Sequence, residues 1–400
     1  MIKIDHLTKE YASGRRAIQD ITFQVAAGEI FGFLGPNGAG KTTTIKILTT
    51  LLRPTSGSAV VSGFNVVENP LAVRMSFGYV GQQSGVDPAL TVRENLLLQG
   101  RLYHLAPSTL RERISFLLDL FDLNGAADMW VGALSGGMKR KLDIGAALIH
   151  QPRLLFLDEP TLGLDPQSRS DLWAYIRRLN REQGVTLFLT THYLDEVDQL
   201  ASRVGILDLG RIQAIGTPDQ LKDSLGADCI HLSFKQPLSD AHLAFFRGKE
   251  PIKEVIRQEG QLRLYLQNGR AALPKVLQWV DEQGLTAETV VLTRPTFDDV
   301  FLKYTGKSLE KENTKEIESS SSWGGGWGKK WGDQQGDGQK EWEKWKKEDA
   351  AEGSSAEGKA GAVAEPEDTA PQKEWPQKDW PQKDWPKKDW KEGEGEWKQK

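Results

Sequence analysis

The sequence predicts an α/β fold built around a phosphate-binding loop, followed by a small α+β domain and a disordered polar tail. Three observations predict this organisation. Residues 35–42 read GPNGAGKT, the G-x-x-x-x-G-K-[ST] pattern of a loop that cradles phosphates. Up to about residue 225, short apolar runs alternate with helical stretches, as in a largely parallel sheet. From 228 to 305, apolar residues alternate with polar ones, as in half-buried strands.

Composition limits the classes of protein to which the chain can belong. It has 400 residues, 38% of them hydrophobic, and a formal net charge of −4 at pH 7, which gives no reason to expect a nucleic-acid partner. The N-terminus lacks the features of a signal peptide, and no eighteen apolar residues run together. Cys229 is the single cysteine. We therefore expect a chain in a reducing cytoplasm, without a membrane span of its own.

The phosphate-binding loop lies between a predicted strand, residues 30–34, and a helix that begins at Thr42. Glycines let successive backbone N–H groups point inward, and the helix dipole adds partial positive charge. Lys41 then supplies an ammonium to the β- and γ-phosphates, and Thr42 a hydroxyl to Mg²⁺. An ordinary glycine turn with a surface lysine is the alternative. The loop residues expected to bind nucleotide are Gly35, Pro36, Asn37, Gly38, Ala39, Gly40, Lys41 and Thr42.

A second apolar strand, residues 154–157, ends in two carboxylates. The carboxyl ends of strands face the crevice in which an α/β sheet binds its ligand. Asp158 would hold Mg²⁺ through water, and Glu159 is placed to polarise the water that attacks the γ-phosphate. An acidic turn after a core strand is the alternative, and the presence of the phosphate loop in the same chain argues against it.

A helix-rich block from about residue 88 to 150 predicts a separate helical lobe. Thr91 with Glu94, and Thr109 with Glu112, have the spacing of capping boxes at two helix starts.

Within this block, Ser135 precedes a further predicted helix as its N-cap, with Gly136 and Gly137 beside it. Such a helix start binds anions. Two anion sites and one phosphate loop suggest that both act on opposite faces of a shared nucleotide. A simple helix cap is the alternative.

The region from 228 to 305 has the predicted order β-α-β-β-α-β, which favours a small ferredoxin-like sandwich. The predicted strands are 230–234, 252–256, 262–266 and 290–292, and the predicted helices are 242–246 and 273–280.

From residue 306 to 400 the composition collapses into charged and small polar residues, and a five-residue repeat places Trp at 375, 380, 385 and 390. Without aliphatic residues to bury, this segment is expected to be disordered. It is either a solvated tail of no fixed role or a multivalent Trp contact to a membrane interface or a partner protein. The sequence does not identify that partner.

In chain order, these motifs resemble the ATP-binding subunit of an ABC transporter, a P-loop NTPase, over residues 1 to about 225. Residues 134–138 (LSGGM) resemble the signature sequence of that family, and residues 154–159 resemble its Walker B strand. Residues 163–165 (GLD) are similar to its D-loop. The joint order of the motifs makes the resemblance specific.

The resemblance also assigns roles to residues that carry little signal alone. His192 resembles the switch histidine that contacts the γ-phosphate, and Tyr11 the aromatic residue that stacks on adenine. Alone, each would more often be a structural or surface residue. Gln82 resembles the Q-loop glutamine, although neighbouring Gln83 leaves the register open. The nucleotide-binding residues that the resemblance implies also include Thr43, Gln82, Ser135, Gly136, Gly137 and Asp165.

For the mechanism, the resemblance implies a head-to-tail homodimer in which ATP lies between the phosphate loop of one subunit and the signature helix of the other. ATP joins the subunits, and hydrolysis lets them separate. Separate transmembrane permease subunits complete the transporter, so the chain is expected at the cytoplasmic face of the cell membrane as a peripheral subunit. The catalytic residues would be Lys41, Glu159 and His192, and the Mg²⁺ ligands Thr42, Gln82 and Asp158.

Within the family, Gly81–Gln82, Met138 and residues 295–301 (PTFDDVF) resemble the daunorubicin-resistance type of drug exporter. This implies efflux of a drug-like or lipophilic substrate. The alternative is a soluble ABC ATPase of translation or DNA repair, but those usually carry two cassettes or a long coiled coil, and neither pattern is present. A regulatory module without catalysis is a third possibility, against which the intact Glu159 and His192 argue.

Overall fold

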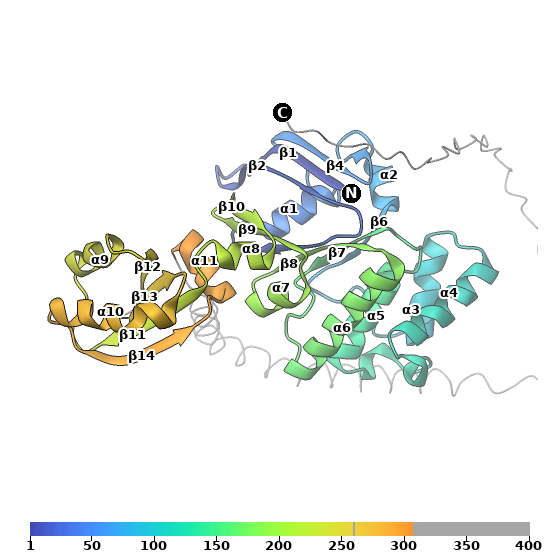
Figure 1. Cartoon of the computed structure of the whole chain (residues 1–400). Helices are drawn as coiled ribbons and strands as arrows, with labels where there is room; N and C mark the ends of the chain where they lie inside the picture. The colour runs from blue at the N-terminus through green and yellow to red at the C-terminus, as the bar shows by residue number, and fades with distance from the viewer. Residues whose placement is uncertain (259–260, 307–400) are drawn as a thin grey trace, which may run out of the picture. The chain divides into compact units, whose positions relative to one another are not determined.

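The structure is a computed structural model that describes residues 1–258 and 261–306 (Figure 1). Apart from residue 306, the tail predicted to be disordered, with its Trp repeat, lies outside the described residues. Within the described ranges, no helix combines the length and the apolar character needed to cross a bilayer.

The core is a six-stranded sheet with strand order β10-β9-β3-β8-β7-β6. All neighbouring strands are parallel except β10, which pairs antiparallel with β9 at one edge. Every residue of β3, β7 and β8 is buried, which explains their continuous apolar runs. The prediction of a largely parallel core sheet is therefore confirmed. The strands are β3 Ile30–Leu34, β6 Phe77–Val80, β7 Leu154–Asp158, β8 Thr186–Thr191, β9 Arg203–Asp208 and β10 Arg211–Gly216.

A second, antiparallel sheet of order β2-β1-β4-β5 was not predicted. Phe23 of this sheet stacks on Phe31 of the core sheet, with ring centroids 5.2 Å apart, and lies 5.5 Å from the ring of Phe33. The two sheets thus share an aromatic core. The strands are β1 Ile2–Glu10, β2 Arg16–Val25, β4 Ser56–Val61 and β5 Phe64–Asn65.

Helices join the core strands, and three of them occupy the predicted helical block. The capping box of Thr91 and Glu94 is confirmed at the start of α3. The one predicted for Thr109 and Glu112 is wrong, because Pro107 fixes a helical φ and α4 begins there. The helices are α1 Lys41–Leu48, α2 Pro70–Met75, α3 Val92–Leu102, α4 Pro107–Leu120, α5 Gly136–Ala147, α6 Pro166–Gln183, α7 Leu194–Leu200 and α8 Pro218–Asp223.

The C-terminal region forms an antiparallel sheet of order β12-β13-β11-β14, and two helices connect strands of this sheet. This is the predicted β-α-β-β-α-β ferredoxin-like order, followed by one more helix. The elements are β11 Asp228–Phe234, α9 Asp240–Arg247, β12 Ile252–Gln258, β13 Gln261–Leu266, α10 Gly269–Glu282, β14 Ala287–Thr293 and α11 Phe297–Thr305.

Helix α11 joins this region to the core. Its Phe297, Val300 and Phe301 share one buried cluster with Val197 of α7 and Val204 of β9.

A buried carboxylate fixes the start of α11. Asp299 accepts hydrogen bonds from the Tyr265 hydroxyl at 2.8 Å, from the Thr296 backbone N–H at 2.7 Å and from the Arg263 guanidinium. Burial opposes its ionisation, but these donors and the arginine charge outweigh burial and lower the pKa of Asp299. Neighbouring Asp298 also pairs with Arg263, at 3.3 Å, but its side chain is 22% exposed.

We predict that Asp299→Ala lowers the free energy of unfolding by about 3–5 kcal/mol, because it leaves the buried Tyr265 hydroxyl without its acceptor and takes from the half-buried Arg263 its buried countercharge, with only the more exposed Asp298 remaining. Asp298→Ala is the matched control and is expected to cost less than about 1 kcal/mol. Urea unfolding followed by circular dichroism measures both. Equal decreases in the free energy of unfolding for the two variants would show that burial of the carboxylate does not determine its contribution to stability.

Candidate active site

A cavity of about 360 Å³ lies at the phosphate-binding loop, where β3 ends and α1 begins. It brings together most of the predicted nucleotide-binding residues. Arg15 and Ala17 also line it and were not predicted. The lining residues are Tyr11, Arg15, Ala17, Pro36, Asn37, Gly38, Gly40, Lys41, Thr42, Thr43, Gln82 and Glu159.

The curl of the loop requires glycine at its last turn. Gly40 has φ +114°, and a Cβ there would lie 2.4 Å from the carbonyl oxygen of Ala17. A side chain is therefore excluded both by backbone conformation and by space. The loop is therefore a glycine cradle at the N-terminus of α1, the kind of site that binds phosphate.

Lys41 folds back into this cradle. Its side chain is 4% exposed, and Nζ donates to the carbonyl oxygens of Gly35 at 2.7 Å and Pro36 at 3.2 Å. Nζ also lies 3.5 Å from Oε1 of Glu159. A buried ammonium needs such a countercharge, so Lys41 joins the loop to the end of β7.

Glu159 occupies the centre of the site. Its φ of +49° is rare for a residue with a side chain and typical of functional positions. Oε2 lies 3.2 Å from Nδ1 of His192, close enough for an ion pair, although Nδ1 makes no well-directed hydrogen bond. Burial alone would raise the pKa of Glu159, but His192 and Lys41 outweigh burial and lower it. The carboxylate is thereby kept ionised, as a base requires.

Asp158 lies beside this group, buried at the end of β7. Burial, reinforced by the charge of Glu159, raises the pKa of Asp158, while hydrogen bonds from the Thr190 and Thr42 hydroxyls oppose the rise. Of the two adjacent glutamines, Gln82 lines the phosphate-loop cavity and Gln83 lines a separate one. Thr42, Gln82 and Asp158 thus offer hydroxyl, amide and carboxylate oxygens, the donor set that suits Mg²⁺.

The predicted signature and D-loop residues form a second group. Ser135 caps α5 by accepting from the Met138 N–H at 3.3 Å, and Asp165 caps α6 by accepting from the Ser168 N–H at 3.0 Å. The starts of α5 and α6 are packed closely together. A Cβ atom added to Gly137 of α5 would lie only 2.8 Å from Oγ of Ser168 in α6. None of the residues Ser135, Gly136, Gly137 and Asp165 lines the phosphate-loop cavity.

Arg140 links the signature helix to the catalytic strand, a role that the sequence did not suggest. It is 7% exposed, and its guanidinium donates to the carbonyl oxygens of Pro160 and Gly81, each at 2.7 Å. Further bonds reach the carbonyls of Asp158 and Glu159. Arg140 therefore links α5, in which it lies, to the Gln82 segment and to the end of β7 by hydrogen bonds.

A second unpredicted residue, Glu196 of α7, lies behind the catalytic pair. It is fully buried and accepts from the Trp173 indole N–H at 3.3 Å. Burial raises its pKa, which favours the neutral acid, and the nearby hydroxyls of Thr191 and Thr161 oppose the rise, although within the described residues neither Oε2 of Glu196 nor Oγ1 of Thr161 makes a well-directed hydrogen bond. Thr191 directly precedes His192 and Thr161 lies two residues after Glu159, so Glu196 lies close to the segments that carry both predicted catalytic residues.

These features define a nucleotide-binding ATPase: a glycine cradle with a buried lysine, and a carboxylate paired with a histidine at the same sheet edge. Matches to family models identify the class of ATPase. Residues 18–162 match the model described as ABC transporter, and residues 216–305 match the C-terminal domain of the ATP-binding protein DrrA1-3-like group.

Individual relatives support the same family assignment. The daunorubicin resistance ATP-binding protein DrrA2 of Streptomyces coeruleorubidus is 41% identical over 319 residues, which cover 79% of this chain and 98% of the relative. The daunorubicin/doxorubicin resistance ATP-binding protein DrrA of Streptomyces peucetius is 40% identical, over 79% of this chain and 95% of the relative. The chain belongs to the family of ABC transporter ATP-binding proteins.

A solved structure has the same core fold. It is cbiO1 of Clostridium perfringens, described as part of the ABC transporter complex cbiONQ. It aligns with a TM-score of 0.52 at 27% identity and covers 55% of this chain and 89% of the other.

We predict that Glu196 positions the catalytic pair as a neutral hydrogen-bonding acid. Glu196→Gln keeps that shape and is expected to retain ATP hydrolysis, whereas Glu196→Ala should lower kcat by about ten- to a hundredfold through misplacement of the pair. The KM for ATP should change little, because Glu196 does not line the cavity. Steady-state ATPase assays measure both constants, with exposed Glu182→Ala as control. A Gln variant as slow as the Ala variant would mean that the charge itself is required.

Proposed function

We propose that this chain is the ATP-binding and ATP-hydrolysing subunit of an ABC exporter that drives efflux of a drug-like or lipophilic substrate through a separate membrane permease. The observation that carries the proposal is the convergence of Lys41, Glu159 and His192 at the phosphate loop. The nature of the substrate rests on the resistance proteins named above, each 40% or more identical to this chain.

In the proposed reaction, the glycine cradle and Lys41 bind the phosphates of ATP. Glu159, kept ionised by its neighbours, accepts a proton from the attacking water, and His192 contacts the γ-phosphate from the other side of the carboxylate. Thr42, Gln82 and Asp158 would hold Mg²⁺, which neutralises phosphate charge when bound. Tyr11, which lines the cavity and whose hydroxyl lies 3.3 Å from Oγ1 of Thr43, would stack on adenine.

A head-to-tail homodimer explains why the site is divided. Ser135, Gly136, Gly137 and Asp165 form a group of helix starts that does not line the cavity of their own subunit. Helix N-termini attract anions. In the proposed dimer these groups cover the ATP held by the partner subunit's loop, where each charge-assisted hydrogen bond contributes on the order of 1.5–3 kcal/mol.

The permease would dock beside the Gln82 segment. A groove there, of about 260 Å³, is lined by Tyr79, Gln83 and Tyr103, and lies next to the segment that Arg140 ties to the catalytic strand. Binding of the permease in this groove would place the chain at the cytoplasmic face of the membrane as a peripheral subunit. The alternative, an ABC ATPase of translation or DNA repair, has no comparable support in the relatives named above.

We predict that Glu159→Gln abolishes ATP turnover but lets ATP hold two subunits together, since the proton acceptor is lost while the binding groups remain. Light scattering should show ATP-dependent doubling of the mass, and a phosphate-release assay should show the loss of hydrolysis. Wild-type protein with ATP is the control. An unchanged rate of hydrolysis would remove Glu159 from the mechanism.

A further variant tests the division of the site between subunits. In the Glu159→Gln background, Ser135→Arg should abolish the ATP-dependent dimer while ATP binding to the monomer persists, because Ser135 does not line the cavity of its own chain. Lys41→Ala in the same background should lose both. Fluorescent ATP binding and light scattering separate these outcomes, and a dimer that survives Ser135→Arg would contradict the head-to-tail arrangement.

A further inference from the structure

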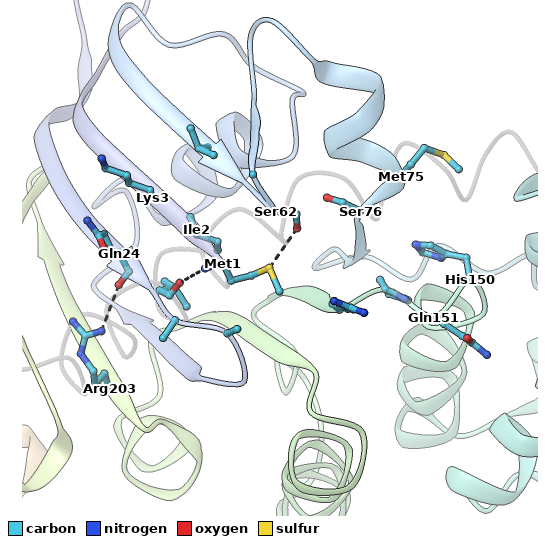
Figure 2. Close-up of a pocket in the computed structure, with 17 residues that line it drawn as sticks. Met1, Ile2, Lys3, Gln24, Ser62, Met75, Ser76, His150, Gln151 and Arg203 are labelled. Atoms are coloured by element: carbon cyan, nitrogen blue, oxygen red, sulfur yellow. Dashed lines mark hydrogen bonds between the residues drawn. The ribbon is translucent and has the colours of Figure 1, made fainter. Parts of the chain in front are cut away.

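A larger cavity, of about 850 Å³, is lined by residues at the amino ends of core strands, whereas the phosphate loop follows the carboxyl end of β3. Figure 2 shows residues that line this cavity. Its lining includes Arg153, which precedes β7, and Arg203, which begins β9. The carboxylates of Asp158 and Glu159 lie at the other end of β7. The proposed ATPase mechanism uses no residue of this cavity.

The apolar surface that the cavity offers comes mainly from Met1 and Met75, because Ile2 and Val25 of the antiparallel sheet are only 2% and 1% exposed and pack into the core. In Figure 2, Met75 and His150 lie to one side of Met1, and Lys3 and Arg203 lie to the other. Methionine side chains adjust to ligands of irregular shape. A cavity of this volume suits a drug-sized molecule with an apolar body.

The charges at the cavity have one sign. Lys3, Arg153 and Arg203 line it, and none of its lining residues is Asp or Glu. Arg203 pairs with Glu29 at 3.1 Å, a residue outside the lining. For Lys3 and Arg153, the described part of the chain provides no side-chain hydrogen bond or ion pair. Both side chains are exposed, so an anionic group that enters the cavity meets two cations that no carboxylate already occupies.

We propose that this cavity is a binding site for an amphipathic organic anion. The apolar body of the ligand packs against Met1 and Met75, and its acidic head lies among Lys3, Arg153 and Arg203. An inorganic anion would make no use of the methionines, and a neutral apolar molecule would make no use of the three cations. The site is distinct from the nucleotide cavity because the two share no lining residue.

The test is calorimetric titration of the full chain with decanoate below its micellar concentration. We expect saturable binding of one decanoate per chain, unchanged when Mg²⁺ and ATP are present. Decanol, which has the same chain without the charge, and inorganic phosphate, which has the charge without the chain, should each bind at least about tenfold more weakly. Binding of decanol or of phosphate equal to that of decanoate would overturn the proposal, as would loss of decanoate binding in the presence of ATP.

A pair of charge-reversed variants locates the site. Lys3→Glu/Arg153→Glu changes two exposed side chains and should weaken decanoate binding by at least about tenfold. The matched control, Arg181→Glu/Lys253→Glu, makes the same change of net charge at exposed positions that do not line the cavity. It should bind decanoate like the wild type. ATP hydrolysis of the three proteins, measured in parallel, verifies that each is folded. Equal affinities for the two double variants would overturn the proposal.

Discussion

The buried charge cluster of Lys41, Glu159 and His192 is the interaction on which the rest of the site depends. An ammonium that is 4% exposed is tolerated only if a carboxylate meets it, and that carboxylate in turn needs its own supports. The sheet supplies the geometry. Strands β3, β8 and β7 are parallel neighbours, so the residues that follow them emerge at one edge. The phosphate loop follows β3, His192 follows β8 and Glu159 follows β7, and the three meet for that reason.

This dependence on strand order explains what the sequence could and could not predict. The loop, the Walker B carboxylates and the cap at Ser135 are local patterns, each readable within about ten residues. The contact between Glu159 and His192 requires knowing that β8 lies between β3 and β7, which no local pattern states. The antiparallel sheet was missed because β1 and β2 pair through irregular registers that blur their alternation. Arg140 and Glu196 carry no signal in the sequence, because a charged residue in a helix is usually solvated.

Arg140 and Glu196 link the separate segments of the site, so that a movement of one segment also moves the others. Each hydrogen bond from a buried guanidinium to a carbonyl contributes on the order of 1.5–3 kcal/mol, so α5 cannot leave the end of β7 without losing several such bonds. A displacement at the signature helix is therefore transmitted to the carbonyls of Asp158 and Glu159 and to Gly81. The buried acid of Glu196 ties the opposite side of the catalytic pair to α6 and α7. The predicted catalytic groups thus have neighbours in Arg140 and Glu196, neither of which lines the phosphate-loop cavity.

Strand β7 also determines how the two cavities relate to one another. It has five residues, all buried, and therefore spans only about 16 Å between Arg153 and the catalytic carboxylates. A close-packed strand with parallel partners on both sides has little room to stretch or bend, so a shift at one end has to move the whole strand or be absorbed at its termini. Any effect of an anion at the amino end on ATP hydrolysis would have to follow one of these two routes. Because Arg140 and Thr190 fix the carboxyl end, absorption at the loop around Arg153 costs less, and the two sites are expected to bind their ligands independently.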